Sequence, residues 1–187
     1  MSATNPVDSS QLNAWLENEK TIKSRVQSGS DAVKIGKEEA LKLTGIELLQ
    51  AMIRGEFPFT GISKTLEFYL AEIADGLATF QGSPGPAHFN PMGGIHGGWY
   101  ATLLDSAMGC AVHSKMPAGR GYTTAELSVN LVRAISPKVT RLRAEGKVIH
   151  CGRQLATAEG RLFGPDGTLY AHGTTTCLVF EYPGTKT

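Results

Sequence analysis

The sequence predicts an α+β domain in which one buried helix lies against a curved antiparallel sheet. Residues 99–112 are apolar on nearly every helical face, a pattern typical of a buried helix. Strand-like segments with hairpin signals lie before and after it. Small residues recur at alternate positions of the last two strand-like segments, so a helix can lie close to that face of the sheet: Ala156, Ala158, Gly160, Ala171, Gly173 and Thr175.

The first sixty residues predict a helical extension. Residues 1 to about 8 are polar and are expected to form a mobile tail. A helix is predicted from Ser9 or Ser10 to near Gly29, and a second over 44–54 with Gly55 ending it. We expect this extension, 1–60, to pack on the remaining domain, 61–183, or on a neighbouring subunit.

The domain that follows is predicted to contain five to six strands. Segments 65–76 and 77–83 form a hairpin signal around Asp75-Gly76. A loop over 84–90 leads to the central helix, which is expected to end near Lys115. The further strand-like segments are 120–133, 140–151, 155–163 and 169–180, and the turn 164–167 separates the last two.

Composition restricts the class of protein. The chain has 187 residues, 41% hydrophobic content and a net charge of +1, which fits one globular domain with modest extensions. The charge favours neither nucleic acid nor a membrane surface as a partner. No apolar run approaches the ~18 residues of a membrane span, and the N-terminus has neither the basic start nor the apolar stretch of a signal peptide. Cys110, Cys151 and Cys177 are widely spaced and form no CxxC, so we expect a cytoplasmic protein without disulfides or a zinc site.

Asp105 lies in the middle of the apolar helix, where an ionised carboxylate is costly unless it is paired or used. A structural Asp held by backbone amides and hydroxyls is the alternative to a functional one. Gly97 and Gly98 begin the helix, where free amides and the positive dipole end suit a carbonyl oxygen that becomes negative.

Asp105 follows Gly97 by eight residues, about 12 Å at ~1.5 Å per residue. A carboxylate must lie within a few Å of the atoms on which it acts. The amide of Gly97 and the carboxylate of Asp105 in one helix therefore cannot easily act on the same carbonyl group. Two antiparallel helices across a two-fold axis can. The spacing therefore predicts a symmetric dimer with two composite sites.

Asn90, the HGG of His96 to Gly98, Asp105 and the later TTAELSVNLVRAISP resemble the PaaI-type hotdog-fold acyl-CoA thioesterases. The resemblance covers roughly 44–180. It implies a long central helix wrapped by an antiparallel sheet, with active sites at a dimer interface, and hydrolysis of an acyl- or aryl-CoA thioester to a free acid and coenzyme A without a cofactor.

Carried over residue by residue, the resemblance assigns the oxyanion donor to the Gly97 amide and the catalytic carboxylate to Asp105, as general base or nucleophile. Asn90 would orient the thioester or the attacking water. The hydroxyl that supports the carboxylate would be Thr124, or Thr123 if the register shifts by one residue. From its place in the turn, His96 is expected to hydrogen-bond backbone.

Further candidate substrate contacts are Gly98, Thr123 and, for the nucleotide end, Gly152 and Arg153 in the turn between two strands. A homodimer is expected, or a dimer of dimers.

Other chemistries lack their motifs. GxSxG is absent, GGIHGG lacks the residues of a phosphate-binding loop, and His88, His96 and His113 have no metal-ligand spacing. Two alternatives stay open: a non-catalytic acyl-CoA-binding protein, and a hydratase or dehydratase. The second is disfavoured because His96 is about 13 Å from Asp105 along the helix.

Overall fold

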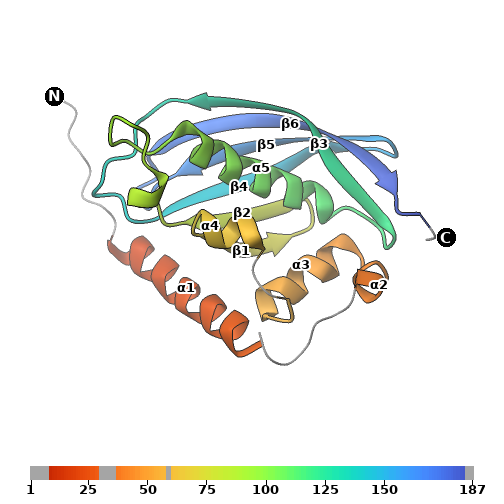
Figure 1. Cartoon of the computed structure of the whole chain (residues 1–187). Helices are drawn as coiled ribbons and strands as arrows, with labels where there is room; N and C mark the ends of the chain where they lie inside the picture. Colours follow the sequence, from red (N-terminus) through yellow and green to blue (C-terminus); the bar gives the residue numbers. More distant parts are fainter. Residues whose placement is uncertain (1–8, 30–36, 58–59, 184–187) are drawn as a thin grey trace.

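The structure, a computed structural model, describes residues 9–29, 37–57 and 60–183 (Figure 1). The predicted polar tail, 1–8, lies outside these residues. A six-stranded antiparallel sheet curves around the central helix α5 (Gly97–His113). The strand order is β1-β2-β4-β5-β6-β3, with β1 at Phe68–Ala74, β2 at Leu77–Gly82, β4 at Leu142–Cys151, β5 at Leu155–Phe163, β6 at Leu169–Glu181 and β3 at Arg120–Leu131. The predicted arrangement of helix and sheet is confirmed.

Small residues allow α5 to lie close to the sheet, as the alternating pattern predicted. A Cβ added to Gly146 on β4 would lie 2.3 Å from the carbonyl oxygen of Ala107, and one on Gly160 of β5 would lie 2.9 Å from the Met108 side chain. Ala156 and Ala158 are fully buried on the same face. The helix backbone therefore rests directly on β4, and side chains of the helix rest on β5.

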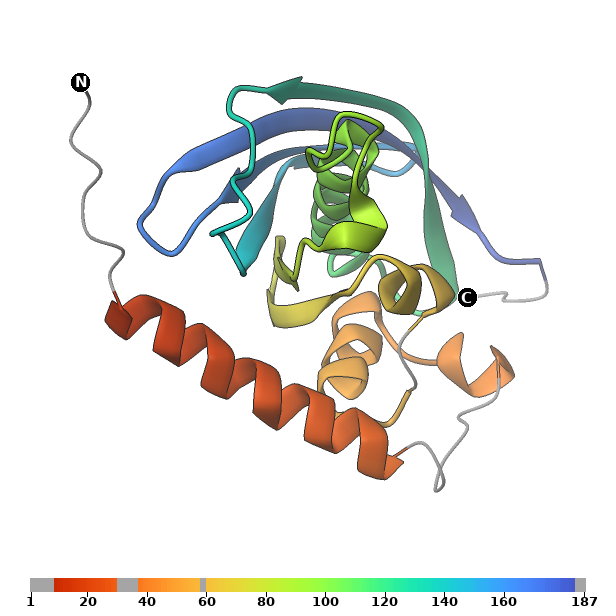
Figure 2. The ribbon, with the colours of Figure 1, turned by 60° about the vertical axis from the view of Figure 1, so that its left-hand side comes forward.

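The structure differs from the sequence prediction along one side of α5. Ala101, Thr102, Asp105 and Ser106 form a half-buried stripe, although the pattern predicted a helix buried on all sides. The reason is that β1 and β3 are the two edges of an open sheet. Figure 2 shows the curved sheet around α5, seen along the helix. The small side chains of the stripe leave the helix accessible there.

The predicted helices of the extension are present. α1 spans Ser9–Gly29 and α3 spans Gly45–Arg54. Thr44 forms a capping box with Glu47, and Gly55 ends α3 with a φ of 83°. Two short helices were not predicted, α2 (Lys37–Ala40) and α4 (Gly61–Thr65), because neither is long enough to repeat an apolar pattern. No helix within the described ranges has both the length and the apolar character needed to cross a membrane.

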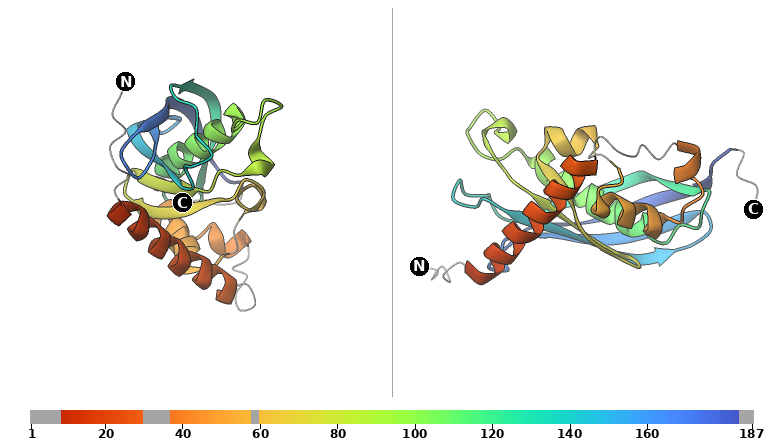
Figure 3. Two further views of the ribbon diagram at one scale, coloured as in Figure 1. Left: turned by 90° about the vertical axis from the view of Figure 1, so that its left-hand side faces the viewer. Right: turned by 90° about the horizontal axis from the view of Figure 1, so that it is seen from below.

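Helix α1 crosses the face of the sheet opposite to α5 (Figures 2 and 3). Glu19 is buried there, accepting hydrogen bonds from Arg141 Nε at 2.6 Å and from Gln81 Nε2 at 3.1 Å. The Arg143 guanidinium lies 4.7 Å from the centre of the Trp15 ring. A buried polar network thus joins α1 to β2 and to the start of β4.

Candidate active site

Asp105 lies in the half-buried stripe of α5, where a side chain of the edge strand β3 reaches it. The Thr124 hydroxyl donates a hydrogen bond to Asp105 Oδ1 at 2.9 Å. Thr123, the neighbouring residue, is exposed on the other face of the sheet, because successive side chains of a strand alternate. Of the two threonines considered from the sequence, Thr124 is the one in contact with the carboxylate.

The N-terminus of α5 presents a free amide. His96 is the N-cap residue, and its Nδ1 accepts a hydrogen bond from the Gly98 N–H at 2.9 Å. The Gly97 N–H makes no hydrogen bond within the described part of the chain. His96 therefore occupies one of the N-terminal donors and leaves the Gly97 donor available to a ligand.

Asn90 shapes the turn that precedes this helix end. Its Oδ1 accepts hydrogen bonds from the backbone N–H of Met92 at 2.9 Å and of Gly94 at 3.1 Å. An isolated bridge between Phe89 and Ile95 closes the same turn. Across residues 9–29, 37–57 and 60–183 the Nδ2 of Asn90 donates to no other group, so it is the part of this side chain that a ligand could engage.

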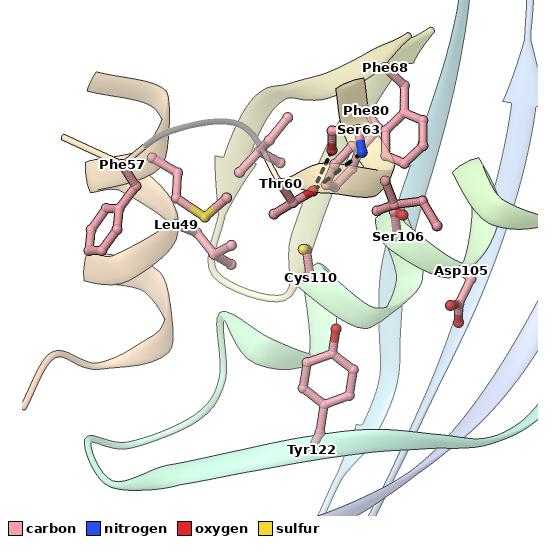
Figure 4. A pocket seen from close by; sticks show the side chains of 13 residues that line it. Leu49, Phe57, Thr60, Ser63, Phe68, Phe80, Asp105, Ser106, Cys110 and Tyr122 are labelled. Carbon is pink, nitrogen blue, oxygen red and sulfur yellow. Dashed lines mark hydrogen bonds between the residues drawn. The ribbon is translucent and has the colours of Figure 1, made fainter. Parts of the chain in front are cut away.

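A cavity of about 210 Å³ lies beside Asp105 (Figure 4). Its walls are mostly apolar, formed by Leu49, Met52, Phe57, Phe68, Leu70 and Phe80. Ser106, Cys110 and Tyr122 also line it, from α5 and β3. Among its described lining residues, Asp105 is the one with a carboxylate, and none carries a basic side chain. The cavity thus combines an apolar interior with one acid.

Burial keeps the other titratable groups of the cavity neutral. Burial, with the nearby charge of Asp105, raises the pKa of the Cys110 thiol to about 12. Burial also raises the pKa of Tyr122 well above its ordinary value. A thiol with so high a pKa is a poor nucleophile near neutral pH. Among the described residues that line this cavity, Asp105 is therefore the candidate for a base or nucleophile.

Gly152 and Arg153 lie away from this cavity, in the turn between β4 and β5. The Arg153 backbone carbonyl accepts a hydrogen bond from Arg120 Nη2, and the side chain of Arg153 is exposed. The structure therefore brings Asp105 and Thr124 together, whereas Gly152 and Arg153 lie at the periphery. No group of three or more metal-ligating side chains occurs in the part of the chain that the structure describes.

The sequence interpretation missed several residues that line the cavity. Tyr122 could have been found, since it lies two residues before Thr124 and shares its face of the strand. The contributions of Leu49 and Met52 had no such signal, because an apolar face on a helix predicts burial but not a cavity.

Apolar side chains are exposed beside the free helix end. Leu131 and Val132, at the end of β3, are each 52% exposed, and Met92 is 92% exposed. Leu131 also contacts Gly97, because a Cβ added to this glycine would lie 2.9 Å from Leu131 Cδ1. Because β3 is at the sheet edge, exposed apolar side chains and an unpaired strand edge lie together beside this helix end.

Comparisons with known proteins place this geometry in context. Residues 92–171 match the family model described as the thioesterase superfamily. None of the curated proteins matches the chain.

Three solved structures share the fold. A thioesterase family protein from Silicibacter pomeroyi is 25% identical, with a TM-score of 0.61 over 65% of this chain and 90% of that one. A phenylacetic acid degradation-related protein from Ralstonia eutropha JMP134 is 26% identical, with a TM-score of 0.63 over 70% and 98%. A conserved protein from Pseudomonas aeruginosa is 26% identical, with a TM-score of 0.61 over 65% and 95%. About a third of the chain has no counterpart in them.

Proposed function

We propose that this chain, a hotdog-fold member of the thioesterase superfamily, hydrolyses acyl-CoA thioesters to a free acid and coenzyme A. The observation that carries the proposal is the carboxylate of Asp105, which Thr124 holds at an apolar cavity free of basic groups. An apolar cavity with one reactive group suits an acyl chain whose thioester carbon stops at the acid.

The proposed site is shared between two subunits. The free Gly97 amide is about 12 Å along α5 from Asp105, too far for both to act on one carbonyl. The half-buried stripe of small residues on α5 and the exposed apolar end of β3 support a two-fold dimer through this face. In such a dimer the helix end of one protomer lies beside the acid of its partner.

The reaction follows from these positions. The thioester carbonyl oxygen accepts a hydrogen bond from the Gly97 N–H, which stabilises the negative charge that develops on it. In the general-base route, Asp105 removes a proton from water as its oxygen attacks the carbonyl carbon. The tetrahedral intermediate expels the thiolate of coenzyme A, which then takes up a proton. In the nucleophilic route, Asp105 attacks the carbon itself, the C–S bond breaks, and water hydrolyses the resulting anhydride.

Other residues have supporting roles in this proposal. The Asn90 Nδ2 orients the thioester or the water, and the Gly98 backbone borders the same helix end. Gly152 and Arg153 are proposed to contact the nucleotide end of coenzyme A, and Thr123, exposed on the outer face of β3, is a further candidate substrate contact. All three cysteines are free thiols, which is compatible with the reducing cytoplasm in which we place the protein.

The test is thiol release from acetyl-, hexanoyl-, octanoyl- and phenylacetyl-CoA. We expect turnover by the natural chain, and a loss of at least ~100-fold in kcat for Asp105→Asn, the scale of a positioned acid–base group. Asp75→Asn is the matched control, because Asp75 is 68% exposed and pairs with Lys115 at the β1–β2 turn. Normal turnover by folded Asp105→Asn would reject the assignment. Binding of acyl-CoA without thiol release from the natural chain would favour a non-catalytic acyl-CoA-binding protein.

A further inference from the structure

The helical extension supplies one wall of the cavity beside Asp105. Leu49 and Met52 reach it from α3, Phe57 and Thr60 lie between α3 and α4, and Ile62 and Ser63 reach it from α4, where the following domain begins. Figure 4 shows Leu49 and Phe57 on the opposite side of the cavity from Asp105. The side of the cavity away from the acid is therefore built by the extension together with α4, and not by the sheet and α5.

This wall is held firmly in place. Leu49 is 3% exposed and belongs to the main core. One turn further along α3, Ile53 packs against both the main core and the cluster that contains Ile22 and Val26 of α1. A Cβ added to Gly55 would lie 2.5 Å from the Arg25 carbonyl oxygen, so the end of α3 touches the α1 backbone. Helix α3 is thus held between α1 and the core and cannot move aside without separating them.

The volume of the cavity limits what can enter. A cavity of about 150 Å³ in another protein holds one benzene molecule. By that scale, a cavity of about 210 Å³ holds a single aromatic ring with a short link, or a chain of about eight carbon atoms. A longer acyl chain would have to displace Met52 or the α3 backbone.

We infer that the extension determines the largest acyl group that this site accepts, with Met52 as the specificity-determining side chain. The inference rests on the proposed function, because it assigns the acyl group to this cavity. Met52 is the appropriate residue because it is only partly buried, so its truncation enlarges the cavity without opening the core. Acyl groups of up to about eight carbons enter, and chains of twelve or more are excluded.

The experiment compares kcat/KM for butanoyl-, octanoyl-, dodecanoyl- and hexadecanoyl-CoA in the natural chain and in Met52→Ala, Met52→Trp and Gln50→Ala. In the natural chain kcat/KM falls at least about tenfold from octanoyl to dodecanoyl, since one misplaced methylene in an apolar pocket already costs that much. Met52→Ala raises the dodecanoyl-to-octanoyl ratio at least about tenfold, and Met52→Trp lowers octanoyl relative to butanoyl by a similar factor. Gln50 is exposed on the same helix, and its variant keeps the natural ratios.

Equal rates on octanoyl- and dodecanoyl-CoA, or an unchanged ratio in Met52→Ala with a natural circular dichroism spectrum, would overturn the inference. Calorimetric binding of the same four acyl-CoAs to Asp105→Asn gives a second readout that needs no turnover. If no variant releases thiol, the proposed hydrolysis fails. The size limit then stands if the affinity of Asp105→Asn falls from octanoyl- to dodecanoyl-CoA and if adding Met52→Ala to this variant restores the affinity for dodecanoyl-CoA. It is overturned if the affinity does not depend on the length of the acyl chain.

Discussion

Thr124 is the residue through which the sheet orients the candidate catalytic acid. Its hydroxyl is the hydrogen-bond donor to Asp105 Oδ1, and no basic side chain pairs with this carboxylate within the described residues. Thr124→Val keeps the shape of the side chain and removes the donor. We expect the carboxylate to lose its fixed rotamer, and kcat to fall between about ten- and a hundredfold, the range that a misplacement of about 1 Å costs.

Thr174→Val is the control for this substitution, because Thr174 is exposed on the outer face of β6. Steady-state thiol release and a thermal melt should be measured on both variants. A Thr124→Val protein with the natural kcat and natural Tm would show that the hydrogen bond has no part in the reaction.

At the scale of single residues, the sequence placed Asp105 correctly in the helix but left Thr123 and Thr124 as alternatives. A shift of one residue in a strand exchanges the two faces of the sheet, and the sequence does not reveal the register. The pairing of Thr124 with the buried Cys177 of β6 settles it. The free Gly97 amide was expected from its place at the helix start. That the His96 ring accepts from the Gly98 N–H, and not from the Gly97 N–H, depends on the rotamer of the His96 side chain and could not be predicted.

At the scale of secondary-structure elements, most boundaries followed from local chemistry. The Asp75-Gly76 turn, the Thr44 cap and Gly55 each have a strong local preference, so the corresponding elements were predicted closely. The face of the sheet that α1 covers could not be predicted, because it depends on contacts between residues far apart in the chain. Glu19 and Arg141 meet across 122 positions.

Glu19 makes the attachment of α1 depend on pH. Burial alone would raise the pKa of its carboxyl, but hydrogen bonds from Arg141 and Lys23 outweigh burial and hold that pKa below its ordinary value. The folded state therefore binds this proton more weakly than the unfolded chain does. The resulting stability is complete above the unfolded pKa and is lost as the pH falls through the folded one.

We therefore expect Glu19→Gln to lower the free energy of unfolding by about 1–3 kcal/mol at pH 7, because charged hydrogen bonds of a buried group are lost. The difference from the natural chain should shrink as the pH falls below about 4. Urea unfolding at both pH values measures it. Glu17→Gln is the control, since Glu17 lies on the same helix with its side chain 71% exposed, where ion pairs contribute little. A difference for Glu19→Gln that does not change with pH would contradict this account.

At the scale of the whole molecule, the open sheet explains why the chain is proposed to act as a dimer. The two edges, β1 and β3, leave one side of α5 uncovered. The extension covers the β1 side of this opening and supplies one wall of the cavity. The β3 side keeps exposed apolar residues next to the Gly97 amide. A second copy of the chain, placed with its Asp105 at that amide, would cover the exposed apolar residues and form two composite sites.

Subunit mixing tests this arrangement directly. Gly97→Pro removes the amide hydrogen at the first position of α5, where proline suits a helix. Asp105→Asn removes the acid, and each variant alone should lose about 100-fold or more in kcat. If each site takes its amide from one protomer and its acid from the partner, a heterodimer of the two variants has one intact site and one doubly defective site. Co-expression in equal amounts then restores about a quarter of the natural activity by random pairing.

A site built within one protomer would give no such recovery. Activity equal to the mean of the two variants, with heterodimers present by native mass spectrometry, would therefore refute the shared site and leave the roles of the two residues to be reassigned within a single chain.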